Sequence, residues 1–82
     1  MEQEHNPRRD TLREILNDIL AEKEEASTIE ELSNEISLTE NLELDSLDLA
    51  EMTVRLEDRY GVDVFKEEVV DEVHEVLNKL DP

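Results

Sequence analysis

The residues best suited to chemistry in this chain lie in the segment Leu44–Leu49, at the predicted start of an amphipathic helix. Asp45 is typical of an N-cap residue, because its carboxylate can accept hydrogen bonds from the unpaired N–H groups of a first helical turn. Asp48 stands where a capping box has its acidic residue. Ser46 is then the first helical residue, and its hydroxyl lies at the positive end of the helix dipole, which favours an anion such as phosphate. This pattern predicts a serine that carries a phosphodiester, provided that another enzyme installs it.

Other chemistry fits this segment poorly. The serine lacks a Gly-x-Ser-x-Gly motif, and only His5 and His74 are available as a base, so a hydrolase triad is not expected. His5 belongs to a polar N-terminal segment, and we expect His74 to be a solvated surface residue beside the apolar stripe of the last helix. Asp45 and Asp48 do not follow the EF-hand spacing, and the chain has no cysteine for a disulfide or a zinc knuckle. We therefore predict no catalytic residue and no specific metal site, although weak binding of divalent cations by clustered carboxylates stays open.

Length and composition indicate one small helical domain. The 82 residues include one Gly, two Pro, one Phe, one Tyr and no Trp, which favours helices over turn-rich β structure and requires an aliphatic core. The formal net charge of −17 argues against nucleic-acid binding and predicts partners that present Lys and Arg. Nothing resembles a signal peptide or a membrane span, so we expect a soluble, cytoplasmic protein. We also expect it to be a monomer.

The N-terminal half predicts one helix followed by a long connection. Residues 1–9 form a polar lead that we expect to be flexible, and residues 10–82 form the single domain. Asp10 or Thr11 can cap the first helix, whose apolar stripe is Leu12, Ile15, Leu16, Ile19 and Leu20. The connection over residues 24–44 is too long to lack structure in a compact domain, and we expect a short helical turn at Thr28–Leu32. Its apolar residues, which should pin it to the core, are Ile29, Leu32, Ile36, Leu38, Leu42 and Leu44.

The second predicted helix runs from Ser46 to about Tyr60 and stops at Gly61, a typical C′ residue. Helical spacing gives it two apolar stripes. The stripe expected in the core contains Leu49, Met52, Thr53, Leu56 and Tyr60. The other contains Leu47, Ala50 and Val54, rimmed by Glu51 and Asp58. The residues alone leave open whether this second stripe is a docking surface or further core, with Val54 buried beneath the first helix.

The C-terminal part predicts a short extended link and a last helix. Phe65 ends the link Val62–Phe65 and is expected to fill the core, and Lys66–Glu68 can form a helical turn. The last helix is predicted from about Val69 to Lys79, on an apolar stripe of Val69, Val70, Val73, Val76, Leu77 and Leu80.

A longer pattern resembles a known family. Glu40–Leu49, continued by Glu51 and Leu56–Val62, is similar to the core of an acyl carrier protein. The Asp-Ser-Leu tripeptide gains specificity here because it opens a helix with an aromatic-Gly-hydrophobic ending, in an acidic chain of matching length. The resemblance covers roughly Asp10 to Leu80. It implies an all-α bundle of three main helices plus a short third helix or turn, with a long loop crossing over two roughly parallel helices.

The resemblance also implies a cofactor and partners. The serine of the family motif carries a covalent 4′-phosphopantetheine arm, whose thiol carries an acyl or aminoacyl group. Ser46 is the implied attachment point, and Asp45, Leu47 and Asp48 are the flanking motif, with the two acids giving an acidic approach to the phosphopantetheinyl transferase that adds the arm. Partner enzymes with basic docking patches read the second helix in that family. The implied partner face is Leu47, Ala50, Glu51, Val54 and Asp58.

The chain departs from typical members at several positions. The segment between Phe65 and the last helix is short, so the family's third helix should be reduced to a turn or fused to the last helix. Glu43 replaces the glycine often found three residues before the serine, and Glu25 and Ala26 replace the usual apolar-Gly ending of the first helix. These departures suggest a specialised or stand-alone carrier.

We therefore expect a non-enzymatic acyl carrier that tethers thioester intermediates in lipid, fatty acid, polyketide or related biosynthesis. A flexible arm would raise the effective concentration of the cargo at each partner site. Two alternatives stay open, namely an aminoacyl (peptidyl) carrier and an acidic helical binding module that never receives an arm.

Overall fold

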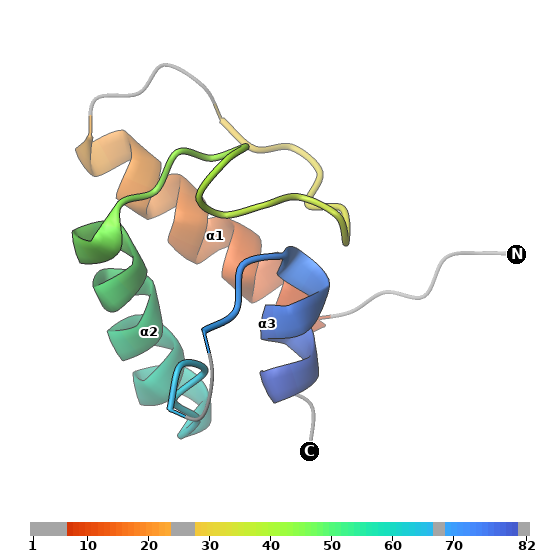
Figure 1. Ribbon diagram of the computed structural model, residues 1–82, viewed down its shortest axis with the longest axis vertical. Coiled ribbons are helices and arrows are strands. Elements are labelled where there is room, and N and C mark those ends of the chain that lie inside the picture. The colour runs from red at the N-terminus through yellow and green to blue at the C-terminus, as the bar shows by residue number, and fades with distance from the viewer. Residues whose placement is uncertain (1–6, 24–27, 67–68, 81–82) are drawn as a thin grey trace, which may run out of the picture.

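The computed structural model of the protein describes residues 7–23, 28–66 and 69–80, and over these ranges the predicted small all-α fold is confirmed. The helices described are α1 (Pro7–Glu22), α2 (Ser46–Tyr60) and α3 (Val73–Leu80). As Figure 1 shows, α2 lies toward the C-terminal end of α1 and α3 toward its N-terminal end, and the long connection crosses the end of the bundle where α2 and α3 begin. In these ranges the only β pairing is one isolated antiparallel bridge between Ser37 and Glu72.

Helix α1 begins earlier than the sequence predicted. Its first residue is Pro7, not Asp10 or Thr11, and a proline suits the first helical position because the N–H that it lacks would have no intrahelical partner there. Arg9, expected in a flexible lead, is helical, and its guanidinium donates to the carbonyl of Leu32 at 2.6 Å. Because α1 starts early, Arg9 in its first turn can hold the long connection at Leu32. Residues 1–6, which include His5, lie outside the described residues.

Helices α1 and α2 lie side by side and run in opposite directions. Lys23, just after α1, contacts Asp48 in the first turn of α2, and Asp18, earlier in α1, contacts Arg55 further along α2. The predicted apolar stripe of α1 is buried throughout, and Met52 and Leu56 of α2 are fully buried against it. The antiparallel arrangement places the end of α1 beside the start of α2.

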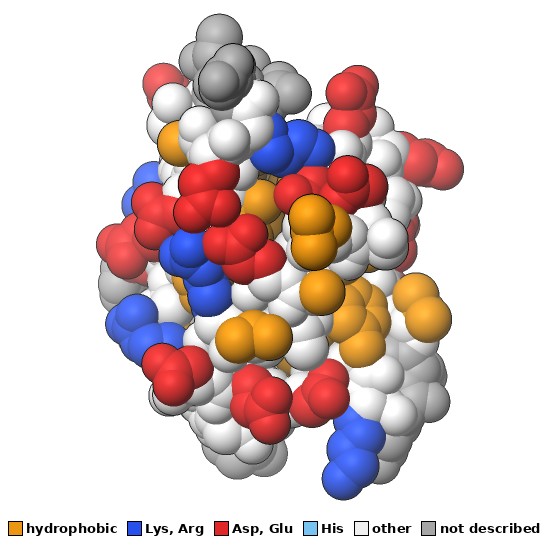
Figure 2. All heavy atoms as spheres, turned by 90° about the vertical axis from the view of Figure 1, so that its left-hand side faces the viewer, with side chains coloured by type: hydrophobic (Ala, Val, Ile, Leu, Met, Phe, Trp, Pro, Cys, Tyr) orange, Lys and Arg blue, Asp and Glu red, His pale blue; other side chains and the backbone are white. Residues whose placement is uncertain are grey.

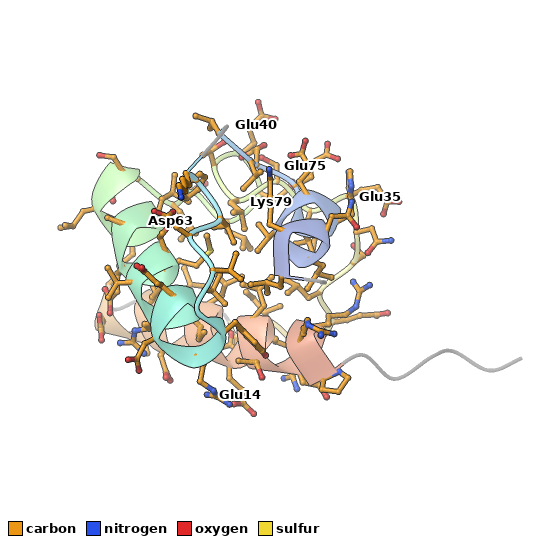
Figure 3. All side chains as sticks on the ribbon, turned by 90° about the horizontal axis from the view of Figure 1, so that it is seen from below. Glu14, Glu35, Glu40, Asp63, Glu75 and Lys79 are labelled. Carbon is orange, nitrogen blue, oxygen red and sulfur yellow. The ribbon has the colours of Figure 1, made fainter. Side chains whose placement is uncertain are left out.

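The core is aliphatic, as the composition predicted. The buried apolar side chains are Leu12, Ile15, Leu16, Ile19, Leu20, Leu32, Leu38, Leu44, Met52, Leu56, Val64, Val70, Val73, Val76, Leu77 and Leu80. Exposed acids surround this core, and Figure 3 shows three of them, Glu14, Glu35 and Glu40, pointing away from the bundle.

The apolar side chains of the connection pack against the core as predicted, but residues Thr28–Leu32 are not helical. Leu32, Leu38 and Leu44 are buried, and the other predicted apolar residues of the connection pack partly buried against the core. Residues 28–32 have no helical hydrogen bonding and bend only at Glu30. The reason is that both backbone polar groups of Ile29 bond to the side chain of Asn17, at 2.7 and 3.1 Å, which takes the place of local helical bonding.

Helix α3 begins at Val73, not at about Val69 as predicted. The chain before it stays extended because Glu72 pairs with Ser37, and because the side chain of Glu75 accepts the N–H groups of Asp71 and Glu72 at 2.9 and 3.0 Å. Val69, assigned to the apolar stripe, is instead 83% exposed. Asp71 and Glu72, directly before α3, instead bond to the connection at Ser37, Leu38 and Thr39.

The segment before α3 contains a turn in place of a third helix, as far as it is described. The N–H of Lys66 donates to the carbonyl of Asp63 at 3.2 Å, closing a turn. Val64 is fully buried and Phe65 only partly, so the core residue of this link is Val64, one position from the prediction. Residues 67–68 of the predicted Lys66–Glu68 turn lie outside the described residues.

Candidate functional site

Ser46 is the first residue of α2, and the predicted capping box forms around it. Oδ1 of Asp45 accepts the N–H of Asp48 at 2.9 Å, and Oδ2 of Asp48 accepts the N–H of Asp45 at 3.1 Å. The Ser46 side chain between them is exposed, and within the described residues no hydrogen bond engages its hydroxyl. A free hydroxyl at the positive end of a helix is compatible with a phosphodiester, whose anionic oxygens the helix dipole would stabilise.

Asp48 was predicted to face an approaching enzyme, but its side chain is buried. Its exposed fraction is 8%, and Lys23 Nζ lies 2.7 Å from Oδ2. Burial alone would raise the pKa of Asp48, but the hydrogen bonds from Lys23 and Asp45, together with the positive charge of Lys23, outweigh it and lower the pKa. Asp48 therefore stays ionised inside the protein, and the acidic approach to Ser46 rests on the exposed Asp45.

Glu43 has φ of +58°, the left-handed region that glycine adopts without strain. This is the position at which the sequence departs from the glycine of the resembling family. Its carbonyl lies 3.4 Å from Lys23 Nζ. The backbone thus keeps a glycine-like conformation before Ser46 although the residue is a glutamate.

The second stripe of α2 is a surface. Leu47 is 76% exposed, Val54 is 64% exposed, and Ala50 between them is also exposed. Burial of Val54 beneath the first helix, the alternative that the sequence left open, is wrong. Figure 2, which looks onto α2, shows hydrophobic side chains gathered on this face among acidic ones.

A shallow depression at the C-terminal end of this stripe is lined by Val54, Glu57 and Asp58. The partner face predicted from the sequence contains Val54 and Asp58 but not Glu57. The spacing could have found it, because residue i+3 lies beside residue i on a helix surface. The depression thus combines one apolar side chain with two acids.

Glu51 differs from the other rim residue, Asp58, because it is tied to the bundle. Its carboxylate lies 2.7 Å from Arg55, which also contacts Glu22 at 3.2 Å and Asp18 at 3.5 Å on α1. The hydrogen bond to Glu51 and the three negative charges raise the pKa of Arg55 against the opposing effect of burial. Glu51 therefore helps to join α2 to α1 as well as standing on the predicted partner face.

His74 lies in the first turn of α3, away from the start of α2 (Figure 1). Its ring Nε2 is 2.8 Å from Glu72, and about half of its side chain is exposed. The structure does not bring it together with Ser46.

The family model of the phosphopantetheine attachment site matches residues 10–80. The chain belongs to this family. It is a carrier protein that bears a covalently attached 4′-phosphopantetheine, and carrier domains of this kind are not catalytic themselves but interact with enzymes that modify and load them. No curated protein and no solved structure matches the chain. Among the described helices of this carrier, none is long and apolar enough to cross a membrane.

Proposed function

We propose that Ser46 is the attachment point of the arm and that this carrier holds acyl groups as thioesters. The observation that carries the assignment of Ser46 is its exposed, unengaged hydroxyl at the N-terminus of α2. The other described serines lack this combination. Ser37 is 7% exposed and bonded to Asp71, and Ser33 lies in the connection, not at a helix start.

The proposed modification is a phosphoryl transfer from coenzyme A. Ser46 Oγ forms a bond to the phosphorus that bears pantetheine, the pyrophosphate bond breaks, and adenosine 3′,5′-bisphosphate leaves. The hydroxyl proton passes to a base of the phosphopantetheinyl transferase, because this chain places no basic side chain in hydrogen-bond contact with Ser46 in its described residues. The product is a phosphodiester that stays anionic at neutral pH and lies at the positive end of the α2 dipole.

Once attached, the arm supplies a thiol that holds the cargo as a thioester. The protein supplies the anchor and the surface by which each enzyme is recognised. Tethering converts the encounter with cargo into an intramolecular one at a high effective concentration.

The proposed partner face is the exposed stripe of α2. It consists of Leu47, Ala50, Glu51, Val54 and Asp58, to which the depression adds Glu57. Apolar side chains at its centre and acids at its edge favour a partner whose apolar patch is rimmed by Lys and Arg. The net charge of −17 would speed association with such a partner, and salt would weaken this effect.

An acyl cargo is proposed over an aminoacyl cargo because the buried apolar side chains are all aliphatic or methionine. An interior of this chemistry suits contact with a hydrocarbon chain. The corresponding pathways are lipid or polyketide biosynthesis. Loading the arm with fatty acyl groups by an acyl-activating ligase, and with amino acids by an aminoacyl-activating enzyme, distinguishes the two: only the acyl thioester should slow amide hydrogen exchange in the core.

Modification is tested directly by incubation with a broad-specificity phosphopantetheinyl transferase and coenzyme A, followed by intact-mass measurement. The proposal expects a gain of one phosphopantetheine per chain. An unchanged mass, under conditions that load another carrier of the family, would favour the unmodified acidic binding module.

A further inference from the structure

Lys23 lies at the point where α1 meets the two segments that flank Ser46. It follows the last residue of α1, yet its N–H still bonds to the carbonyls of Ile19 and Leu20, at 3.2 and 3.1 Å, so the helix fixes its backbone. Its side chain extends to α2, where Nζ is 2.7 Å from Asp48 Oδ2 and 3.4 Å from the carbonyl of Glu43. One ammonium group therefore contacts a residue on each side of the serine.

The same carboxylate oxygen of Asp48 that contacts Lys23 also accepts the N–H of Asp45, at 3.1 Å. The other oxygen of the capping box, on Asp45, accepts the N–H of Asp48. A continuous set of hydrogen bonds thus runs from Lys23 through Asp48 to the backbone N–H of Asp45, the residue before Ser46. Lys23 holds the Asp48 carboxylate in the orientation that closes the capping box.

Removing the ammonium would leave Asp48 as a buried carboxylate without its countercharge. Such a group is driven to turn toward water or to take up a proton, and either change weakens the bond to the N–H of Asp45. The carbonyl of Glu43, whose backbone is left-handed, would also lose a donor. Both changes act on the backbone within three residues of Ser46.

We infer that Lys23 is a positioning residue for the modification of Ser46. It does not touch the serine but fixes the first turn of α2 so that the hydroxyl meets the phosphorus of coenzyme A in line. The inference rests on the proposed attachment at Ser46. Phosphoryl transfer is sensitive to such placement, because its rate depends on holding the attacking and leaving oxygens in line.

The test compares the rate of arm transfer to Lys23→Met, Lys23→Arg and the wild type. Lys23→Met should lower kcat about tenfold and change KM for the carrier much less, because the docking surface on α2 is left in place. Lys23→Arg should recover most of the rate, since its guanidinium can also donate to Asp48. Lys66→Met removes the same charge from an exposed position and should behave as the wild type.

A double-mutant cycle with Asp48→Asn shows whether Lys23 acts through Asp48. The asparagine needs no countercharge, so Lys23→Met should slow transfer much less in the Asp48→Asn background than in the wild type. Equal slowing in both backgrounds would overturn the inference, as would an unchanged kcat for Lys23→Met. If Lys23→Met does not fold, Lys23→Gln replaces it, and a wild-type kcat for Lys23→Gln overturns the inference.

Hydrogen exchange at the N–H of Asp45 separates this inference from the proposed attachment. In Lys23→Met this amide should exchange faster than in the wild type, while core amides keep their protection. One outcome is that the wild type receives no arm while the Asp45 amide still exchanges faster in Lys23→Met than in the wild type. In that case the attachment at Ser46 is wrong and the hydrogen-bonded link from Lys23 to Asp45 is right. If the wild type is loaded and the Asp45 amide is unaffected by Lys23→Met, the link is wrong.

Discussion

Asn17 and Ile29 are joined by two hydrogen bonds in opposite directions. The side-chain amide of Asn17 donates to the carbonyl of Ile29 at 3.1 Å, and its oxygen accepts the N–H of Ile29 at 2.7 Å. One side chain in the middle of α1 thus satisfies both backbone polar groups of a residue in the connection. Because the connection delivers the chain to Ser46, this pair is part of what positions the site.

Replacing Asn17 with alanine should destabilise the fold. The change leaves the part-buried N–H and carbonyl of Ile29 without partners, which costs about 1–3 kcal/mol of unfolding free energy. Chemical denaturation would measure the loss. Asn78→Ala, at an exposed position of α3, should change stability by less than about 0.5 kcal/mol. Equal effects of the two substitutions would mean that the pair does not hold the connection.

The two faces of α2 should respond differently to substitution. Leu56 is fully buried, so Leu56→Ala should cost about 2–5 kcal/mol of unfolding free energy. Val54 is 64% exposed, so Val54→Asp should leave the melting temperature nearly unchanged. It should instead slow arm transfer, because the new charge must be desolvated in the apolar contact with the transferase. A strongly destabilised Val54→Asp that is loaded at the normal rate would argue against the proposed face.

Glu43→Gly should stabilise the protein. The left-handed backbone at Glu43 costs a residue with a side chain about 1–2 kcal/mol, and glycine avoids this cost, partly offset by its greater freedom in the unfolded chain. Thermal unfolding should therefore show a higher melting temperature. Glu40→Gly, outside the left-handed region, should lower it. A destabilised Glu43→Gly would mean that the glutamate side chain contributes more than its backbone strain costs.

Asp71 should make stability depend on pH. The hydrogen bond from Ser37, at 2.5 Å, and those from Thr39 lower the pKa of Asp71 against the opposing effect of burial. A carboxyl group whose pKa is lowered by folding contributes stability above its unfolded pKa of about 4, and this contribution is lost as pH falls through the folded pKa. The stability difference between wild type and Asp71→Asn should thus be largest near neutral pH and shrink in acid.

Urea denaturation at several pH values between neutral and acid would measure this difference. Asp58→Asn, which removes the same charge from an exposed position, should give a small difference at every pH. A difference for Asp71→Asn that does not shrink on acidification would contradict the role given to its ionised form.

The parts of the fold that local spacing specifies could be predicted from the sequence. The apolar stripe of α1, the capping box of Asp45 and Asp48, and the C-cap at Gly61 all form. Each depends on residues within one or two helical turns, where periodicity and capping rules hold. Of the core stripe predicted for α2, Met52 and Leu56 are buried, whereas Leu49, Thr53 and Tyr60 are only partly buried. The exposed stripe with Val54 was also placed by its spacing, although spacing could not decide between surface and core.

Two of the features that were missed depend on pairs distant in sequence. Helix α3 begins late because Glu72 pairs with Ser37, and Asp48 is buried because Lys23 reaches it from the end of α1. Residue patterns within one segment carry no information on such pairs. The same holds for the non-helical backbone at Ile29, where the tertiary contact to Asn17 outweighs local helix preference.

The central claim is that the arm is attached at Ser46, and peptide mapping of the modified protein by mass spectrometry tests it most directly. After incubation with transferase and coenzyme A, fragmentation should place one phosphopantetheine on Ser46. Ser46→Ala should gain no mass while keeping its melting temperature, and Ser33→Ala, at another exposed serine, should be modified as the wild type is. An arm on any other residue, or a folded Ser46→Ala that still gains the arm, would contradict the account.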